Sequence, residues 1–254
     1  DNNGEVVAPV TAQDFVDALQ YVLTPDYASS NVGLVTAYIA GADDYYNYHV
    51  YLTNAENGTV DDDGTTYVTD GSGNVTVTAA DGTASTYAPV DFDSVGVTAV
   101  DDKTLEVQLN VPVSYFLSLM YFPTFYPVNE AFYNTCADTF GTSPETVLSN
   151  GAFVLTDYQP AATAFAMEKN PDYYDADKIA LDGLAYQVIK DSQQALMSYQ
   201  TGTLDITLLN GEQVDQVKDD PEFTSVGAGY LWYISPNIDA VPDLANLNLR
   251  KAMT

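Results

Sequence analysis

The stretch from Asn150 to Asp175 constrains the fold more than any other part of this 254-residue chain. Its sequence, NGAFVLTDYQPAATAFAMEKNPDYYD, begins with an Asn-Gly turn and continues with two apolar runs. Asn170 is a residue type favoured at helix caps, and proline is tolerated at the first helical position, which Pro171 would occupy. The stretch therefore predicts an antiparallel strand pair that leads into one helical turn.

Short Thr- and Val-rich runs alternate with turn dipeptides between residues 53 and 90. The dipeptides are Asn57-Gly58, Asp63-Gly64, Asp70-Gly71 and Asp81-Gly82. Asn-Gly and Asp-Gly between alternating runs are the strongest short-range signal of a β-hairpin. The pattern predicts a small β-meander.

The rest of the chain mixes helical and strand patterns. Thr11 and Asp14 have the spacing of a capping box, and apolar residues follow at helical spacing. A second helix is expected from about residue 28 to 48. Beyond the meander we expect strands at 94–100, 104–109, 184–189, 204–206 and 230–234, and helices at 114–120, 130–138, 191–202 and 211–218. The succession from 184 to 206 fits a right-handed crossover that ends in a buried strand, and the whole pattern indicates a mixed α/β (α+β) fold.

Charge is distributed unevenly along the chain. The formal net charge is −29, and all seven basic residues lie at Lys103 or later. Such a chain repels nucleic-acid phosphates and anionic lipid surfaces, so we expect no nucleic-acid partner. The acidity fits an affinity for cations or cationic peptides, and it also fits the solubility of a secreted protein, which is the interpretation we favour.

Cysteine and histidine are sparse and far apart, and the many carboxylates lie in no context that suggests a raised pKa. Cys136 is the only cysteine, so no internal disulfide is possible, and His49 is the only histidine. Nothing near Cys136 resembles a catalytic signature, and we interpret His49 as a surface or capping residue. The sequence contains no phosphate-binding glycine loop, nucleophile elbow or zinc-spaced cluster. We therefore expect no enzyme activity and no cofactor.

Two acidic stretches match functional patterns only in part. Aligning Asp61, Asp63 and Gly64 with the calcium-loop pattern puts Thr59 where the first acid belongs. The run Asp-Thr-Phe-Gly at 138–141 interrupts the Asp-Thr-Gly motif of aspartic proteases and has no second copy. We interpret the first stretch as a solvated acidic turn and dismiss the second as an aspartic protease motif.

Several motifs, taken in chain order, resemble one protein family. They are PVTAQDFV at 9–16, VTAVDDKTLEV at 97–107, PVSYFL at 112–117, FGTSPE at 140–145, NGAFVL at 150–155, EKNPDYY at 168–174 and KDS at 190–192. They are similar to motifs of the extracellular solute-binding proteins, family 5, which serve peptide and nickel ABC transporters. Tyr174 stands where that family usually has Trp. The resemblance covers roughly residues 5–48 and 92–254.

The resemblance implies a type II periplasmic-binding-protein-like fold, present here as a partial bilobed structure. Residues 1–104 would form part of the smaller lobe, with the β-meander at about 50–90 as an insertion. Residues 105–254 would form part of the first large ligand-binding lobe, and the other large lobe would be missing. We accordingly expect this sequence to be an internal fragment of a longer protein.

The function implied by the resemblance is the capture of oligopeptides in a cleft between lobes and their delivery to an ABC transporter permease in the membrane. The full-length parent would be extracellular, anchored to the cell surface by lipid or periplasmic, and this fragment monomeric. Because half of the cleft would be absent, we expect the fragment to bind peptide weakly or not at all.

Five residues are candidates for ligand contact. On a strand at 230–234, Tyr230 and Trp232 share one face and Leu231 lies on the other. The resemblance places this strand at the crossover between lobes, where aromatic rings supply large amphipathic contact surfaces. It also places the turn with Leu208 and Asn210 in the lining of the same cleft. A core strand and a helix cap are the plainer interpretations of these two segments.

Three alternative functions stay open. The ligand could be a nickel chelate, haem or a sugar, since the resembled family includes such binders. The Thr-rich meander and the acidity also fit a surface adhesin or interaction module. A carboxylate-based hydrolase would require paired acids about 5–10 Å apart in a cleft.

Overall fold

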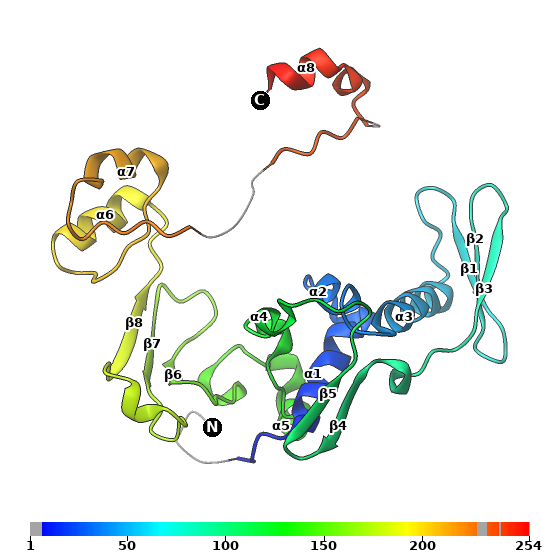
Figure 1. Cartoon of the computed structure of the whole chain (residues 1–254), viewed down its shortest axis with the longest axis horizontal. Helices are drawn as coiled ribbons and strands as arrows, with labels where there is room; N and C mark the ends of the chain where they lie inside the picture. Colours follow the sequence, from blue (N-terminus) through cyan, green and yellow to red (C-terminus); the bar gives the residue numbers. More distant parts are fainter. Residues whose placement is uncertain (1–6, 228–232, 239, 254) are drawn as a thin grey trace. The chain divides into compact units, whose positions relative to one another are not determined.

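The computed structural model describes residues 7–227, 233–238 and 240–253 (Figure 1). The chain divides into two compact units, Asp1–Val188 and Ile189–Thr254, and each is described by itself. The helices of the first unit are α1 (Ala12–Leu23), α2 (Val32–Thr36), α3 (Ala42–Asn57), α4 (Phe116–Leu119) and α5 (Glu130–Cys136). Its strands are β1 (Thr66–Thr69), β2 (Val75–Thr78), β3 (Ala84–Tyr87), β4 (Val97–Asp101), β5 (Thr104–Val107), β6 (Phe153–Asp157), β7 (Ala164–Lys169) and β8 (Gly183–Gln187). The second unit contains α6 (Ser192–Gln200), α7 (Gly211–Val217) and α8 (Leu247–Ala252).

The strands form three small antiparallel sheets, with orders β1-β2-β3, β4-β5 and β6-β7-β8. All eight overlap the segments in which the sequence predicts strands or hairpins, so the predictions of strands in these segments are confirmed. None of the described helices is long and apolar enough to cross a membrane.

The core of the first unit forms where α1 packs against α2, α3 and the β4-β5 pair. Its most deeply buried side chains include Leu23, Val35 and Ile39, none of which has exposed surface. The predicted capping box starts α1, because the Asp14 carboxylate accepts a hydrogen bond of 2.6 Å from the amide of Thr11. The cap fixes the first turn of the helix and thereby the direction in which its apolar face meets the core.

The single helix expected over residues 28–48 is wrong. The chain forms α2, then breaks, then forms α3 after Gly41, which has φ +72°. Ile39 forms a β-bridge with Leu109, and the amide of Ala40 donates to the carbonyl of Gln108. This pairing with a distant segment competes with helix formation. A Cβ at position 41 would lie 2.3 Å from the carbonyl oxygen of Ser94, so the position requires glycine.

The meander is fixed to α3 by aromatic contacts. Tyr51 stacks on Tyr67 of β1 with ring centroids 5.9 Å apart and contacts Tyr87 of β3 at 4.8 Å. The hydroxyl of Tyr48 donates to the carbonyl of Gly73 at 2.9 Å. Val75 has no exposed surface. Figure 1 shows the three strands at one end of α3.

Aspartates shape the hairpin turns with their carboxylates. Asp63, Asp70, Asp81 and Asp101 each accept a hydrogen bond from the backbone amide two residues further along. These bonds favour the charged form and lower the pKa of the exposed Asp63, Asp81 and Asp101 carboxyls. The side chain of Asn74 makes the largest contribution to the lowered pKa of Asp70. These four carboxylates therefore serve local turn geometry.

Asn170 caps a tight turn rather than a helix. Its side chain accepts from the amide of Asp172 at 3.0 Å and donates to the carbonyl of Gly151 at 2.8 Å. Its own amide donates to the carbonyl of Ala152. Asn170 is thus tied to the turn before β6, and only a 3₁₀ turn, Ala176–Lys178, follows. The strand pair expected here is confirmed, and the helical turn directly after Asn170 is wrong.

His49 is neither a surface nor a capping residue. Its ring lies half-buried on α3, with centroids 4.2 Å from Tyr45 and 5.1 Å from Tyr48, and its Nε2 lies 3.2 Å from the carbonyl oxygen of Val90. Burial lowers the pKa of His49, although the Val90 carbonyl and the charge of Asp91 act in the opposite direction.

This environment predicts a pH-dependent loss of stability. Because the pKa of His49 is lower in the folded than in the unfolded chain, the unfolded state binds more protons as the pH falls below the ordinary histidine pKa. Urea unfolding should show lower stability at about pH 5 than at pH 7, a window above the range in which ordinary carboxylates titrate. His49→Gln, which keeps an N–H donor, should lose less stability over that window. An equal loss of unfolding free energy between pH 7 and pH 5 in the two proteins would contradict the lowered pKa of His49.

Candidate functional site

The second unit is organised by two helix starts that are linked to each other. The side chain of Asp191 caps α6, and the side chain of Asn210 caps α7 in a reciprocal capping box with Gln213. Gln213 is 2% exposed, and its Nε2 donates to the backbone carbonyl of Ser192 at 2.7 Å. Asn210 donates to the Ser192 hydroxyl at 3.0 Å. These bonds hold the start of α7 against the start of α6.

The segment between the two helices was expected to contain a buried strand at 204–206, and this expectation is wrong. Residues 204–210 carry no strand, and the side chain of Ile206 is 82% exposed. Within the described part of the chain, no hydrogen bond joins the backbone of residues 205–209 to another strand. A strand needs a neighbour to pair with, and the described residues supply none for this segment.

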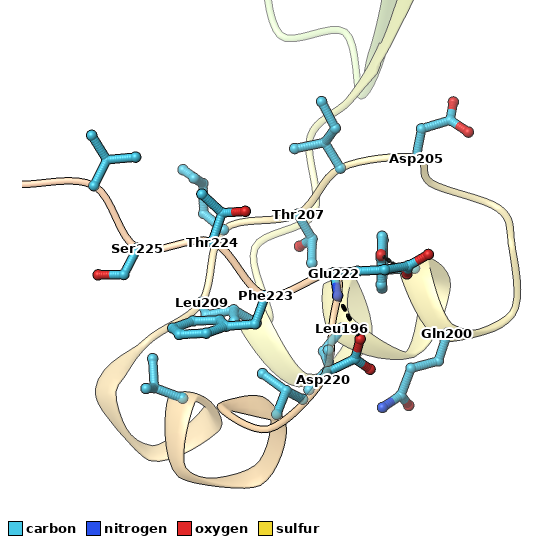
Figure 2. A pocket seen from close by; sticks show the side chains of 16 residues that line it. Leu196, Gln200, Asp205, Thr207, Leu209, Asp220, Glu222, Phe223, Thr224 and Ser225 are labelled. Carbon is cyan, nitrogen blue, oxygen red and sulfur yellow. Dashed lines mark hydrogen bonds between the residues drawn. The ribbon is translucent and has the colours of Figure 1, made fainter.

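A cleft of about 640 Å³ lies between α6, α7 and the segments 205–209 and 222–226 (Figure 2). Its apolar lining includes Leu196, Leu209 and Phe223, and three carboxylates, Asp205, Asp220 and Glu222, also line it. Among the described residues that line this cleft there is no Lys or Arg. We refer to it as the α6–α7 cleft.

Hydrogen bonds fix part of the acidic lining. The carboxylate of Asp220 accepts from the amide of Glu222 at 2.9 Å, the contact drawn in Figure 2. The hydroxyl of Tyr199 donates to the carboxylate of Glu222. This bond raises the pKa of Tyr199, because ionised tyrosine could not donate it. The arrangement can receive apolar groups at its lining and attract positive charge.

Two of the five predicted site residues lie at the α6–α7 cleft or beside it. Leu208 lines the cleft and is 90% exposed. Asn210 follows the lining segment, but its side chain is engaged in capping α7. Tyr230, Leu231 and Trp232 lie outside the described residues, as does most of the strand expected at 230–234. Contact of any of the five with ligand stays a prediction.

Sequence reasoning missed Gln213, the buried residue that links the two helices. The signal was available, because Asn210 and Gln213 have capping-box spacing.

Sequence reasoning also missed a second hollow, of about 450 Å³, in the first unit. That hollow is lined by residues of 7–10, 148–150 and 170–174, with Asp14 and Asn129 among its polar groups. The Asp14 carboxylate there is already bonded to Thr11 and Asn129.

Comparison with known proteins gives the family. The model for bacterial extracellular solute-binding proteins, family 5 Middle, matches residues 2–254. The chain belongs to this family. The family 5 oligopeptide-binding protein OppA of Bacillus subtilis is 30% identical over 260 residues, which cover 100% of this chain and 39% of that protein. The dipeptide-binding protein DppE of the same organism is 35% identical over 160 residues, 63% of this chain and 29% of that protein.

Solved structures agree with the assignment to family 5. OppA of Listeria monocytogenes bound to peptide matches with a TM-score of 0.63 at 28% identity, over 84% of this chain and 34% of that chain. The substrate-binding domain of an oligopeptide ABC transporter from Bacillus anthracis matches with a TM-score of 0.62 at 31% identity, over 84% of this chain and 33% of that chain. The predicted α/β, type II periplasmic-binding-like fold is confirmed. The chain spans about a third of the length of these proteins.

The Gln213 contacts predict a specific loss of stability. Gln213→Leu leaves the carbonyl of Ser192 and the amide of Asn210 without their partners, which should cost roughly 1–3 kcal/mol. Amide hydrogen exchange should show this loss as faster opening of both α6 and α7. Gln216→Leu on the exposed side of α7 is the matched control and should change the opening free energy by less than about 0.5 kcal/mol. Faster exchange in α7 alone would contradict the link between the helices.

Proposed function

We propose that this chain is part of the substrate-binding component of a peptide ABC transporter, which captures oligopeptides and delivers them to the permease. The observation that carries the proposal is the match of the whole chain to the oligopeptide-binding protein OppA of Bacillus subtilis. The mechanism is closure of the protein around its ligand rather than covalent chemistry. Among the described residues, no group of three or more His, Cys, Asp or Glu could hold a metal ion.

The α6–α7 cleft is consistent with this role. Apolar side chains such as Leu208 and Phe223 can accept side chains of different shapes. The neighbouring carboxylates favour ligands with positive groups, including the amino terminus of a peptide. Bridging water accommodates varied peptide sequences at such a polar edge. Tyr230, Leu231, Trp232 and Asn210 are proposed to contribute further contacts.

The lobe assignment is part of the same proposal. Residues 1–104 would belong to the smaller lobe and carry the meander as an insertion, and residues 105–254 would belong to the first large lobe. The complete protein would reside outside the cell, bound to the surface by a lipid anchor or held in the periplasm. Its partners would be the oligopeptide and the membrane permease, with the chain itself monomeric.

A non-peptide ligand is the second candidate, favoured by one relative. A probable deoxycholate-binding periplasmic protein, YgiS of Escherichia coli, is 34% identical over 128 residues, 50% of this chain and 24% of that protein. A nickel chelate, haem or a sugar are further ligands of this class.

Native mass spectrometry of the complete gene product, taken directly from cell extract, tests the proposed function. A peptide receptor should carry a distribution of added masses at peptide spacings, because a tolerant site retains many sequences. One sharp added mass would instead support a chelate, haem, sugar or sterol-like ligand. A protein with no added mass that also fails to bind a mixed peptide library would contradict the peptide proposal and favour the surface adhesin or interaction module.

The isolated 254-residue chain should bind peptides weakly or not at all. Closure around a ligand requires surfaces on both sides of it, and this chain spans about a third of the relatives' length. Isothermal titration with the same peptide library should therefore give no saturation in the micromolar range, while the complete gene product saturates. A sub-micromolar titration with the isolated chain would contradict this expectation.

A further inference from the structure

Asn-Gly pairs are the places in a protein chain where asparagine is most easily converted to aspartate. The amide nitrogen of the following residue attacks the asparagine side chain, and glycine favours this step because, without a Cβ, it lets the backbone reach conformations closed to other residues. The chain contains four such pairs, which begin at Asn3, Asn57, Asn150 and Asn210. Asn3 lies outside the described residues. The structure gives the other three very different surroundings.

The pair at Asn57 is held by the end of α3. Asn57 is the last residue of this helix, so its backbone is fixed in the helical conformation. The amide of Gly58, the group that would attack, donates to the carbonyl of Ala55 at 3.2 Å as part of the helix cap. Reaction at this pair first requires the end of the helix to open.

The pair at Asn210 is held at the start of α7. The Asn210 side chain accepts from the amide of Gln213 at 3.0 Å and donates to the Ser192 hydroxyl at 3.0 Å. Both polar atoms of the carboxamide that would have to turn and react are therefore engaged. Reaction at this pair requires the loss of a helix cap, which lowers its rate.

The pair at Asn150 lies in an exposed turn without these constraints. Asn150 and Gly151 are exposed and lie outside every helix and strand. Among the described residues, neither the Asn150 side chain nor the Gly151 amide forms a hydrogen bond. The two residues just after the reacting bond are anchored, because Asn170 donates to the carbonyls of Gly151 and Ala152. The attacking nitrogen and the side chain can thus approach each other beside a fixed segment.

We propose that Asn150 is a site of spontaneous deamidation. The Gly151 nitrogen forms a bond to Cγ of Asn150, the bond from Cγ to Nδ2 breaks, and ammonia leaves with the proton of the Gly151 amide. Water then opens the resulting succinimide ring at either of its carbonyls and yields aspartate or isoaspartate. The reaction requires only the chain and water, with no oxidant, reductant or enzyme.

The modification would act on the turn that Asn170 holds. Isoaspartate places an additional methylene group in the backbone directly before Gly151. The Gly151 carbonyl accepts from Nδ2 of Asn170 at 2.8 Å, and the Ala152 carbonyl accepts from the Asn170 amide at 2.9 Å. Isoaspartate at position 150 should therefore loosen the tie between the turn before β6 and Asn170, which is 7% exposed.

Site-resolved mass spectrometry of the 254-residue chain, incubated in mildly alkaline buffer, tests the proposal. Peptide mapping follows the mass increase at each pair, and a protease that cleaves before aspartate but not before isoaspartate distinguishes the two products. Asn150 should react at least about tenfold faster than Asn57 or Asn210, because only the latter two must first break helix-end hydrogen bonds. Incubation in urea removes this protection, so the three rates should converge there.

Gly151→Ala is the matched variant, because a Cβ at this position would have no neighbour within 4 Å and the residue does not have a positive φ. It should slow the reaction of Asn150 at least about fivefold, since alanine reaches fewer backbone conformations than glycine, while Asn57 and Asn210 keep their rates. In the isoaspartate fraction, separated by its added charge, the Asn170 amide should exchange hydrogen faster. If Asn150 reacts no faster than Asn57 and Asn210, or if its lead is equally large in urea, the proposal is overturned, and unchanged exchange at Asn170 would overturn the loosening of the turn.

Discussion

Residues 1–102 have to stabilise their carboxylates without Lys or Arg of their own, since the first basic residue of the chain is Lys103. Hydrogen-bond donors take the place of ion pairs. The buried Asp14 accepts from the amide of Thr11 and the side chain of Asn129, which joins the start of α1 to the start of α5. Turn aspartates such as Asp70 accept from backbone N–H groups of their own turns. Because N–H donors stabilise a carboxylate without needing a counter-charge, the acidic composition is compatible with a folded hairpin insertion.

The second unit depends on a different interaction, the buried amide of Gln213. Among its described residues, Leu196 is the only buried apolar side chain and Gln213 the only buried polar one. A pair of short helices with so little buried apolar surface gains limited stability from packing. The hydrogen bonds from Gln213 to Ser192 and Asn210 therefore set the geometry of the α6–α7 cleft. The first unit, by contrast, draws its stability from a continuous core that includes Leu23, Val35 and Ile39.

Local patterns in the sequence predicted the elements that depend on local interactions. The hairpins of the meander and the capping box at Thr11 are fixed by residues close together in the chain, and both are confirmed. The break at Gly41 was missed, because it is imposed by pairing of Ile39 with the distant Leu109. The strand at 204–206 was expected from its apolar residues, but a strand also requires a partner, and the described residues supply none. Leu208 lines the α6–α7 cleft, and its contact with ligand stays a prediction. Gln213 was overlooked because a polar residue inside a helix is usually exposed.

Long-range charge and short-range contact affect a solute at different stages of binding. A net charge of −29 raises the encounter rate of cationic solutes and lowers that of anionic ones, with an effect that salt screens over about 10 Å. The apolar lining of the α6–α7 cleft acts only after contact and is not subject to electrostatic screening by salt. Under the proposed function, the acidity would select solutes by charge during approach, and the apolar lining would accept varied side chains after contact. The acidity and the cleft thus make separate contributions to recognition, one mainly to the association rate and the other mainly to the lifetime of the complex.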